Sequence, residues 1–197
     1  MLKGKKIGVV ITGSHCTLEK AMIQLKELKK QGAELFPIIS SSMFLDTRFG
    51  KGSHWIEEIK EITQKPVISG VVEAEPIGPN KFLDILIVIP CTGNTLAKLA
   101  NAITDNGALM AIKAHLRNNR PVVLAVSTND GLSQNASNIA RLITHRNIFF
   151  VPFGQDNPQG KPFSLVANLD KVLPTIEKAL SKNQVQPILI EYKAKND

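Results

Sequence analysis

The chain has 197 residues, 43% of them hydrophobic, and a mean hydropathy close to zero. This length predicts one domain that buries a sizeable core without disulfide or metal staples. The longest apolar run, residues 85–89, is far shorter than the roughly 20 residues that cross a bilayer. The first residues do not read as a signal peptide. We therefore expect a cytoplasmic protein without a membrane segment.

Basic residues outnumber acidic ones by 24 to 17, which gives a formal net charge of +7. Such a balance suits nucleic acid, a membrane surface or anionic small molecules. The lysines are scattered, and one Trp and one Tyr supply few platforms for stacking bases. The composition therefore favours an anionic small ligand over nucleic acid or membrane. Cys16 and Cys91 form no CxxC pair, so neither a disulfide scaffold nor a metal site is predicted.

Short apolar runs alternate with stretches of helical periodicity along the chain. Residues 6–12 read as a strand buried on both faces, followed by a helix that Gly32 ends. Further strands are expected at 35–39, 85–89, 121–126 and 148–151, and further helices at 54–64, 95–117 (with a break near 105–107), 133–145 and 169–180. Residues 42–53, 73–81 and 153–164 read as irregular loops.

This alternation predicts an α/β fold: a single-domain doubly wound parallel sheet, Rossmann-like or flavodoxin-like, flanked by helices. We expect the domain to cover residues 1–184 and to be followed by a polar C-terminal tail over 185–197. In such sheets ligands bind beyond the carboxyl ends of the strands. The residues that follow those ends are the place to look for chemistry.

Small polar residues gather after four of the expected strands. We name them the site rim: Thr12, Gly13, Ser14, Ser40, Ser41, Cys91, Thr92, Asn94, Thr95, Ser127, Thr128 and Asn129. Free N–H groups at helix starts attract anions, and glycine lets the backbone approach them closely. The pattern suits a phosphate joined to a flat polar ring. The alternative is that these residues are ordinary helix caps. No GxGxxG or Walker phosphate loop is present.

One segment carries a specific resemblance. Residues 90–106 read PCTGNTLAKLANAITDN, which resembles the segment running from a proline through Asn-Thr and Ala-Lys to Asp-Asn in the homo-oligomeric flavin-containing cysteine decarboxylases. Ala102 stands where that family usually has glycine. Residues 11–14 and 124–142 are similar too, with Asn129 on the family's loop asparagine. The resemblance extends over about residues 5–180 and implies flavin mononucleotide (FMN) as cofactor, held by the site rim. It also implies a trimer-based homo-oligomer, up to a dodecamer.

Departures from the family concern its reaction. The position of the decarboxylases' catalytic His holds Pro76, and the positions of a loop Met and a downstream Trp hold Thr128 and Ser133. No Cys follows Cys91, although some members have a late clamp Cys. The resemblance therefore implies that flavin binding is kept and cysteine decarboxylation is lost. The catalytic residues stay unassigned.

Residues 152–158 and 161–167, which read PFGQDNP and KPFSLVA, are similar to one branch of that family found in spore-forming bacteria. This likeness implies an oxidoreductase subunit whose partner subunit carries NADP or NAD. It implies oxidation of a dihydrodipicolinate-level dicarboxylate to dipicolinate in the mother cell. Lys161 could then close over substrate. The alternatives left open are a flavin-dependent lyase of the decarboxylase type and a non-catalytic scaffold.

Overall fold

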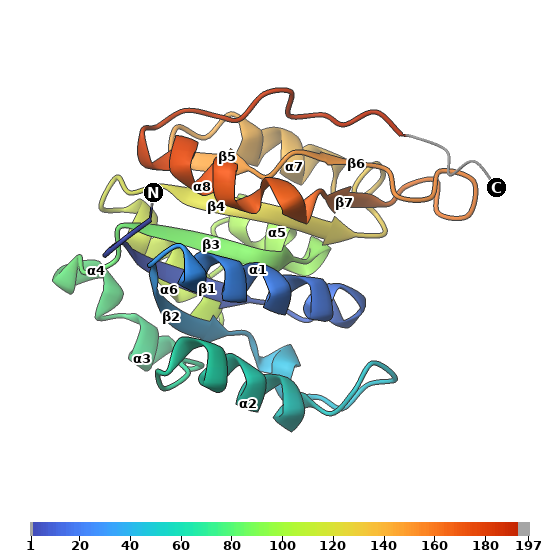
Figure 1. Ribbon diagram of the computed structural model, residues 1–197. Coiled ribbons are helices and arrows are strands. Elements are labelled where there is room, and N and C mark those ends of the chain that lie inside the picture. The colour runs from blue at the N-terminus through green and yellow to red at the C-terminus, as the bar shows by residue number, and fades with distance from the viewer. Residues whose placement is uncertain (1, 193–197) are drawn as a thin grey trace.

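The computed structural model describes residues 2–192, and the end of the expected polar tail, residues 193–197, lies outside the described residues. A central sheet is covered by helices on both faces (Figure 1). Its five parallel strands are β1 (Lys6–Ile11), β2 (Glu34–Ile39), β3 (Ile85–Cys91), β4 (Val122–Thr128) and β5 (Ile148–Phe150). They lie in the order β2-β1-β3-β4-β5. This is the flavodoxin-like order, and the expected doubly wound α/β fold is confirmed.

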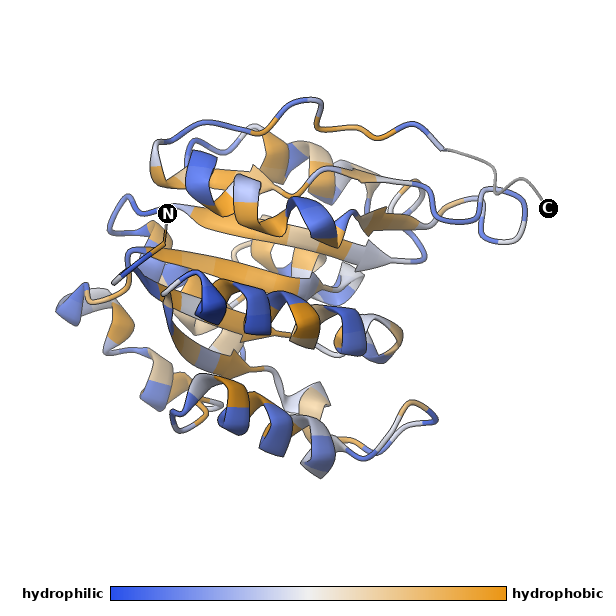
Figure 2. Cartoon of the chain, viewed as in Figure 1, coloured by the Kyte–Doolittle hydropathy of each residue, from blue (hydrophilic) through white to orange (hydrophobic). Residues whose placement is uncertain are grey.

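The middle strands form the centre of the core. All seven residues of β3 are buried, as are five of the six in β1. Figure 2 shows these strands as a continuous apolar band between helices with polar outer faces. Strands that carry helices on both faces have no solvated side, which is why residues 85–89 show no alternation of polar and apolar residues.

Helices cover both faces of the sheet. In Figure 1, α1 (Leu18–Lys30) and α8 (Val172–Leu180) lie in front of it, while α5 (Gly93–Ala100), α6 (Gly107–Leu116) and α7 (Ala136–Ile143) lie behind. The helix α2 (Gly52–Thr63) packs beside α1 at the β2 edge. The break expected near residues 105–107 is present between α5 and α6, where Asn106 caps the second helix.

All three stretches expected to be irregular contain or overlap short elements. The 73–81 stretch overlaps α3 (Val71–Ala74) and α4 (Ile77–Asn80), and residues 41–44 form the short 3-10 helix η2 (Ser41–Phe44). The stretch 153–164 begins with the short strand β6 (Phe153–Gly154) and is followed by the short strand β7 (Leu165–Ala167). β7 runs antiparallel to the end of β4. Elements this short show no periodicity, so their sequences could not reveal them.

The short 3-10 helix η3 (Leu169–Lys171) leads into α8, and after α8 the chain returns to the sheet. The side chain of Gln184 bonds both backbone groups of Phe150, at 2.8 and 2.7 Å. Phe153 then exchanges backbone hydrogen bonds with Ile188 and Ile190 at 3.0 and 2.9 Å. The first part of the expected polar tail is therefore attached to β6. Within residues 2–192, no helix is long and apolar enough to span a membrane.

Candidate functional site

The carboxyl ends of β1 and β3 are joined by one buried side chain. The hydroxyl of Thr12 donates to the carbonyl oxygen of Pro90 at 2.7 Å and accepts the N–H of Thr92 at 3.2 Å. In a sheet of this strand order, β1 and β3 flank the point where the order reverses, which is where ligands bind. Thr12 is 1% exposed and fixes the geometry of this point.

The helix α5 begins at that same point. Thr92 caps it, because its hydroxyl accepts the N–H of Thr95 at 3.3 Å, and the two hydroxyls lie 3.0 Å apart. The N–H groups of Gly93 and Asn94 belong to the first turn, which has no acceptors inside the helix. Asn94 is exposed and Thr95 is buried. The start of α5 thus offers free donors and the positive end of a helix dipole.

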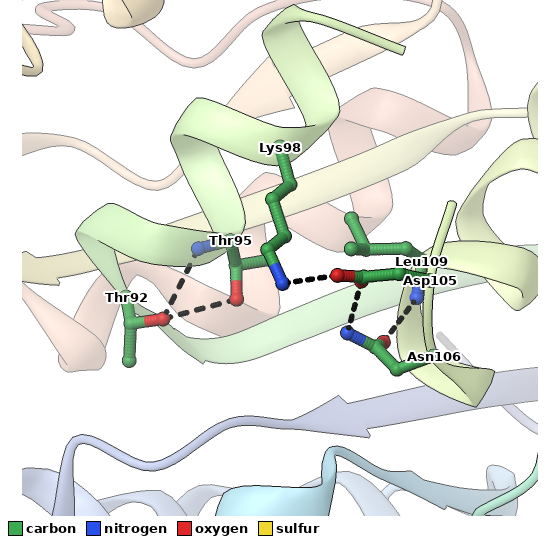
Figure 3. A network of polar contacts seen from close by, with 6 residues as sticks. All are labelled: Thr92, Thr95, Lys98, Asp105, Asn106 and Leu109. Atoms are coloured by element: carbon green, nitrogen blue, oxygen red, sulfur yellow. Dashed lines mark hydrogen bonds and ion pairs between the residues drawn. The ribbon is translucent and has the colours of Figure 1, made fainter. Parts of the chain in front are cut away.

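The second half of the 90–106 segment holds α5 against α6. Figure 3 shows Lys98 of α5 paired with Asp105, whose other oxygen accepts from the amide of Asn106 at 3.0 Å. The side-chain oxygen of Asn106 accepts the N–H of Leu109 at 3.0 Å and so caps α6. The Lys98 ammonium group holds the pKa of the Asp105 carboxyl below its usual value. These residues position the start of α5 relative to α6.

Gly13 allows the end of β1 to approach the end of β2. A Cβ on Gly13 would lie 2.6 Å from the hydroxyl of Ser42, closer than real Cβ contacts come. Ser42 in turn lies 2.6 Å, oxygen to oxygen, from Ser40. Ser40 is 8% exposed, and Ser41 is exposed. This part of the rim places small hydroxyls beside a glycine that a side chain would block.

A second hydroxyl cluster joins the start of α1 to the end of β4. The hydroxyl of Ser127 lies 2.9 Å from that of Ser14 and 2.8 Å from that of Thr17. Asp130 holds the loop that follows β4. Its carboxylate accepts a hydrogen bond from the Thr128 hydroxyl and another, at 2.9 Å, from the side-chain amide of Asn135. Asn129 is left exposed at the tip of this loop.

Gly93 brings the first part of the rim against this loop. A Cβ at Gly93 would lie 2.5 Å from the Thr128 hydroxyl and 2.7 Å from both the Asn135 amide nitrogen and an Asp130 oxygen. A side chain at this position would require those side chains to shift, so glycine favours the close approach of α5 to the 128–135 loop. The rim segments that follow β1, β3 and β4 are therefore brought into one site.

Cys91 differs from the other rim residues. It is fully buried in the core, and burial raises the pKa of its thiol. Its side chain packs in the core as part of β3, and its contact with a cofactor stays a prediction. Cys16 is exposed, and its sulfur lies 3.7 Å from the Ser14 hydroxyl. Pro76 lies just before α4, on the segment that leads into the amino end of β3.

A cavity of about 700 Å³ opens beside the second hydroxyl cluster. The site rim contributes Ser14, Ser127, Thr128 and Asn129 to its lining. Most of its other lining residues were not predicted from the sequence, and they come from α1 and the segment around β7 and η3: Cys16, Thr17, Lys20, Ile23, Gln24, Asp156, Val166, Ala167, Asn168, Leu169 and Asp170. Lys161, singled out from the sequence, lines it too. No local motif marks the missed residues, because distant segments meet only in the fold.

The donor set of the rim suits a flavin that carries a phosphate. The free N–H groups of α5 and the surrounding hydroxyls suit a phosphate, and the close approaches at Gly13 and Gly93 keep the rim narrow. In the described part of the chain, Nδ1 of His15 is buried without a hydrogen-bond partner. A polar atom in that state is costly unless a ligand or solvent group satisfies it.

Comparison with known proteins gives close relatives. The B subunit of dipicolinate synthase from Bacillus subtilis is 51% identical over 197 residues, which cover 100% of this chain and 98% of that protein. A flavin prenyltransferase of Saccharolobus solfataricus is 29% identical over 126 residues, 63% of this chain and 62% of that protein.

Solved structures agree with the fold. The crystal structure of the dipicolinate synthase B subunit from Bacillus halodurans has a TM-score of 0.89 at 48% identity, covering 96% of this chain and 98% of that one. The structure of cypemycin decarboxylase has a TM-score of 0.68 at 17% identity, covering 92% and 96% of the two chains, and shares the fold. A profile of the flavoprotein family matches residues 1–179. The resemblance seen in residues 90–106 is thereby confirmed, and this chain belongs to the flavoprotein family.

Proposed function

We propose that this chain is the flavin-binding B subunit of a dipicolinate synthase, which acts with an A subunit that binds NADP or NAD. The complex would oxidise a dihydrodipicolinate-level intermediate to dipicolinate in the mother-cell cytoplasm during sporulation. The observation that carries this proposal is the 51% identity to the Bacillus subtilis protein, which extends over the whole chain.

FMN is the proposed cofactor. The similar proteins include a flavin prenyltransferase and an FMN-dependent cysteine decarboxylase, and the rim supplies donors for a phosphate and a polar ring. Thr92, Asn94 and Thr95 would hold the phosphate at the start of α5, with Thr12 and Gly13 beside it. Ser40 and Ser41 would bind ribityl or phosphate oxygens. The edges of the flavin ring would be contacted by Ser14, Ser127, Thr128 and Asn129. Bound flavin would supply the redox chemistry, and the protein its orientation.

The chain's own residues would orient the group and limit solvent access. The Ser14–Thr17–Ser127 hydroxyls already satisfy one another, so they present fixed dipoles that need little rearrangement when a ligand binds. The buried Thr12 keeps β1 and β3 in register beneath the site. No residue of the rim is assigned as a catalytic base. A partner subunit or a further copy of this chain, in a trimer-based assembly, would complete the site.

Two measurements test the proposal. The purified chain is expected to show flavin absorbance, or to bind FMN on titration, and absence of both would contradict it. Co-expression with a candidate for the nicotinamide-binding partner should then give dipicolinate-forming activity, coupled to the nicotinamide, that requires flavin. Asn94→Leu should abolish flavin binding and that activity together. If activity survived without flavin, the chain would be a scaffold; carbon dioxide release from cysteine-ended peptides would instead indicate a lyase.

A further inference from the structure

The 700 Å³ cavity beside the rim has polar groups that the flavin roles leave unused. It lies between α1 on one side and β7 with η3 on the other, and residues of the 155–164 loop border it. Its lining includes Ser14, Thr17 and Ser127, whose hydroxyls form one cluster. Its volume is within the range of roughly 300–1,000 Å³ typical of small-molecule sites.

Two lysines reach this cavity from separate elements. Lys20 comes from α1 and Lys161 from the 155–164 loop. Within residues 2–192, neither ammonium group has a hydrogen-bond or ion-pair partner, whereas Lys26 of the same helix is paired with Glu58 at 2.7 Å. Two unpaired cations that face one cavity are suited to a ligand with two anionic groups.

Amide groups add further donors. Gln24 lines the cavity, and its side chain has no hydrogen-bond partner among the described residues. The side-chain oxygen of Asn168 accepts the N–H of Asp170 at 3.1 Å, which leaves its amide hydrogens available to the cavity. Amide donors beside ammonium groups can bind the outer oxygens of a carboxylate.

Two carboxylates also line the cavity and balance the two lysines. Asp156 is engaged through one oxygen by the hydroxyl of Ser164 at 2.8 Å. Asp170 is exposed at the start of η3. The lining therefore carries no net excess of positive charge. The positions of the two ammonium groups, and not the total charge, would determine which anion binds. Asp170 is a repulsive element that limits the affinity for any dianion.

We propose that this cavity is the dicarboxylate site of the chain, in which Lys20 and Lys161 each bind one carboxylate of the diacid. The identity of the acid rests on the proposed function. Because Ser127, Thr128 and Asn129 belong both to this cavity and to the proposed ring-binding loop, the diacid would lie beside the cofactor site.

Cys16 provides a direct report on occupancy. It lines the cavity and is exposed, whereas Cys91 is fully buried, so N-ethylmaleimide should alkylate Cys16 alone in the folded protein. Alkylation would be followed by mass spectrometry on FMN-treated protein with and without pyridine-2,6-dicarboxylate. The diacid is expected to slow alkylation at least about fivefold, and pyridine-2-carboxylate, which lacks one carboxylate, far less. Equal protection by the two acids, or none by the diacid, would overturn the proposal.

Charge variants provide the second arm, measured by calorimetric titration with the same diacid. Lys20→Gln and Lys161→Gln should each weaken binding about tenfold, as expected for loss of a charge-assisted contact. Lys30→Gln, which removes the same charge from an exposed position of α1, should leave binding unchanged, and Asp170→Asn should tighten it. Unchanged affinity in both lysine variants would refute the site. Diacid binding without synthase activity in the reconstituted complex would instead count against the proposed function alone.

Discussion

The hydroxyl of Thr12 donates a 2.7 Å hydrogen bond to the carbonyl oxygen of Pro90, across the boundary between β1 and β3. Pro90 has no N–H to offer the strand ladder, and the β3–β4 register shifts between Val88 and Cys91. One side chain thus holds the strand end where the ladder is interrupted. It also accepts the N–H of Thr92, which caps α5. The start of the proposed phosphate-binding helix depends on this contact.

Thr12→Val tests that dependence. Valine keeps the shape but leaves the Pro90 carbonyl and the Thr92 N–H unpaired in a buried place, so the free energy of unfolding should fall by about 1–3 kcal/mol. FMN affinity should fall with it. Thr12→Ser, which keeps the hydroxyl, should retain most of both. Urea unfolding and flavin titration measure the two effects, and a Val variant as stable as the parent would contradict the argument.

Gly93→Ala tests the close approach of α5 to the 128–135 loop. The added Cβ would meet Thr128, Asn135 and Asp130 at 2.5–2.7 Å and push the helix start away from the loop. We expect FMN affinity to drop at least about tenfold, since a displaced donor loses its contact. Gly70→Ala is the matched control, because its nearest neighbour would lie 3.5 Å away. Equal flavin affinity in both variants would argue against a site at α5.

Ala102→Gly should stabilise the protein. Ala102 is exposed after α5 and adopts a φ of 57°, in the left-handed region that costs a residue with a Cβ about 1–2 kcal/mol. Glycine removes that cost but is more flexible in the unfolded chain, so the expected net gain is about 0.5–1 kcal/mol. Ala97→Gly, in the interior of α5, should destabilise the protein by about 1 kcal/mol. Thermal unfolding should show a higher midpoint temperature for the first variant and a lower one for the second, and a decrease in both would contradict the argument.

Stability should decrease in mildly acidic solution because of His115. This residue is 1% exposed, and burial lowers its pKa from 6.5 to about 4. Between these values the unfolded chain binds a proton that the folded chain does not, so stability falls as pH decreases from 6.5 to about 4. The loss amounts to on the order of 3 kcal/mol.

His115→Gln removes the titrating ring and should flatten the dependence of unfolding free energy on pH between 6.5 and 5. His54→Gln, at an exposed position of α2, should leave it as in the parent. Glu34, Glu73 and Asp105, whose pKa values are lowered by hydrogen bonds or ion pairs, contribute only at lower pH. An unchanged slope in the His115 variant would assign the acid sensitivity elsewhere.

The sequence by itself determined the sheet and the rim that its strand ends form. Burial on both faces leaves unbroken apolar runs such as residues 85–89, and caps and glycines mark where helices begin. These are local signals, so they could be read along the chain. The motif in residues 90–106 additionally indicated the family, because its spacing combines a strand end, a cap and the Asn106 helix start.

Only the tertiary structure decided which polar residues share a space. It buried the thiol of Cys91 in the core, brought the hydroxyls of Ser14 and Ser127 within 2.9 Å, and placed Lys20 and Lys161 at one cavity. Contacts between residues more than a hundred positions apart leave no periodic trace in the sequence. They arise because parallel strands bring their carboxyl ends to a single edge, whatever their separation along the chain.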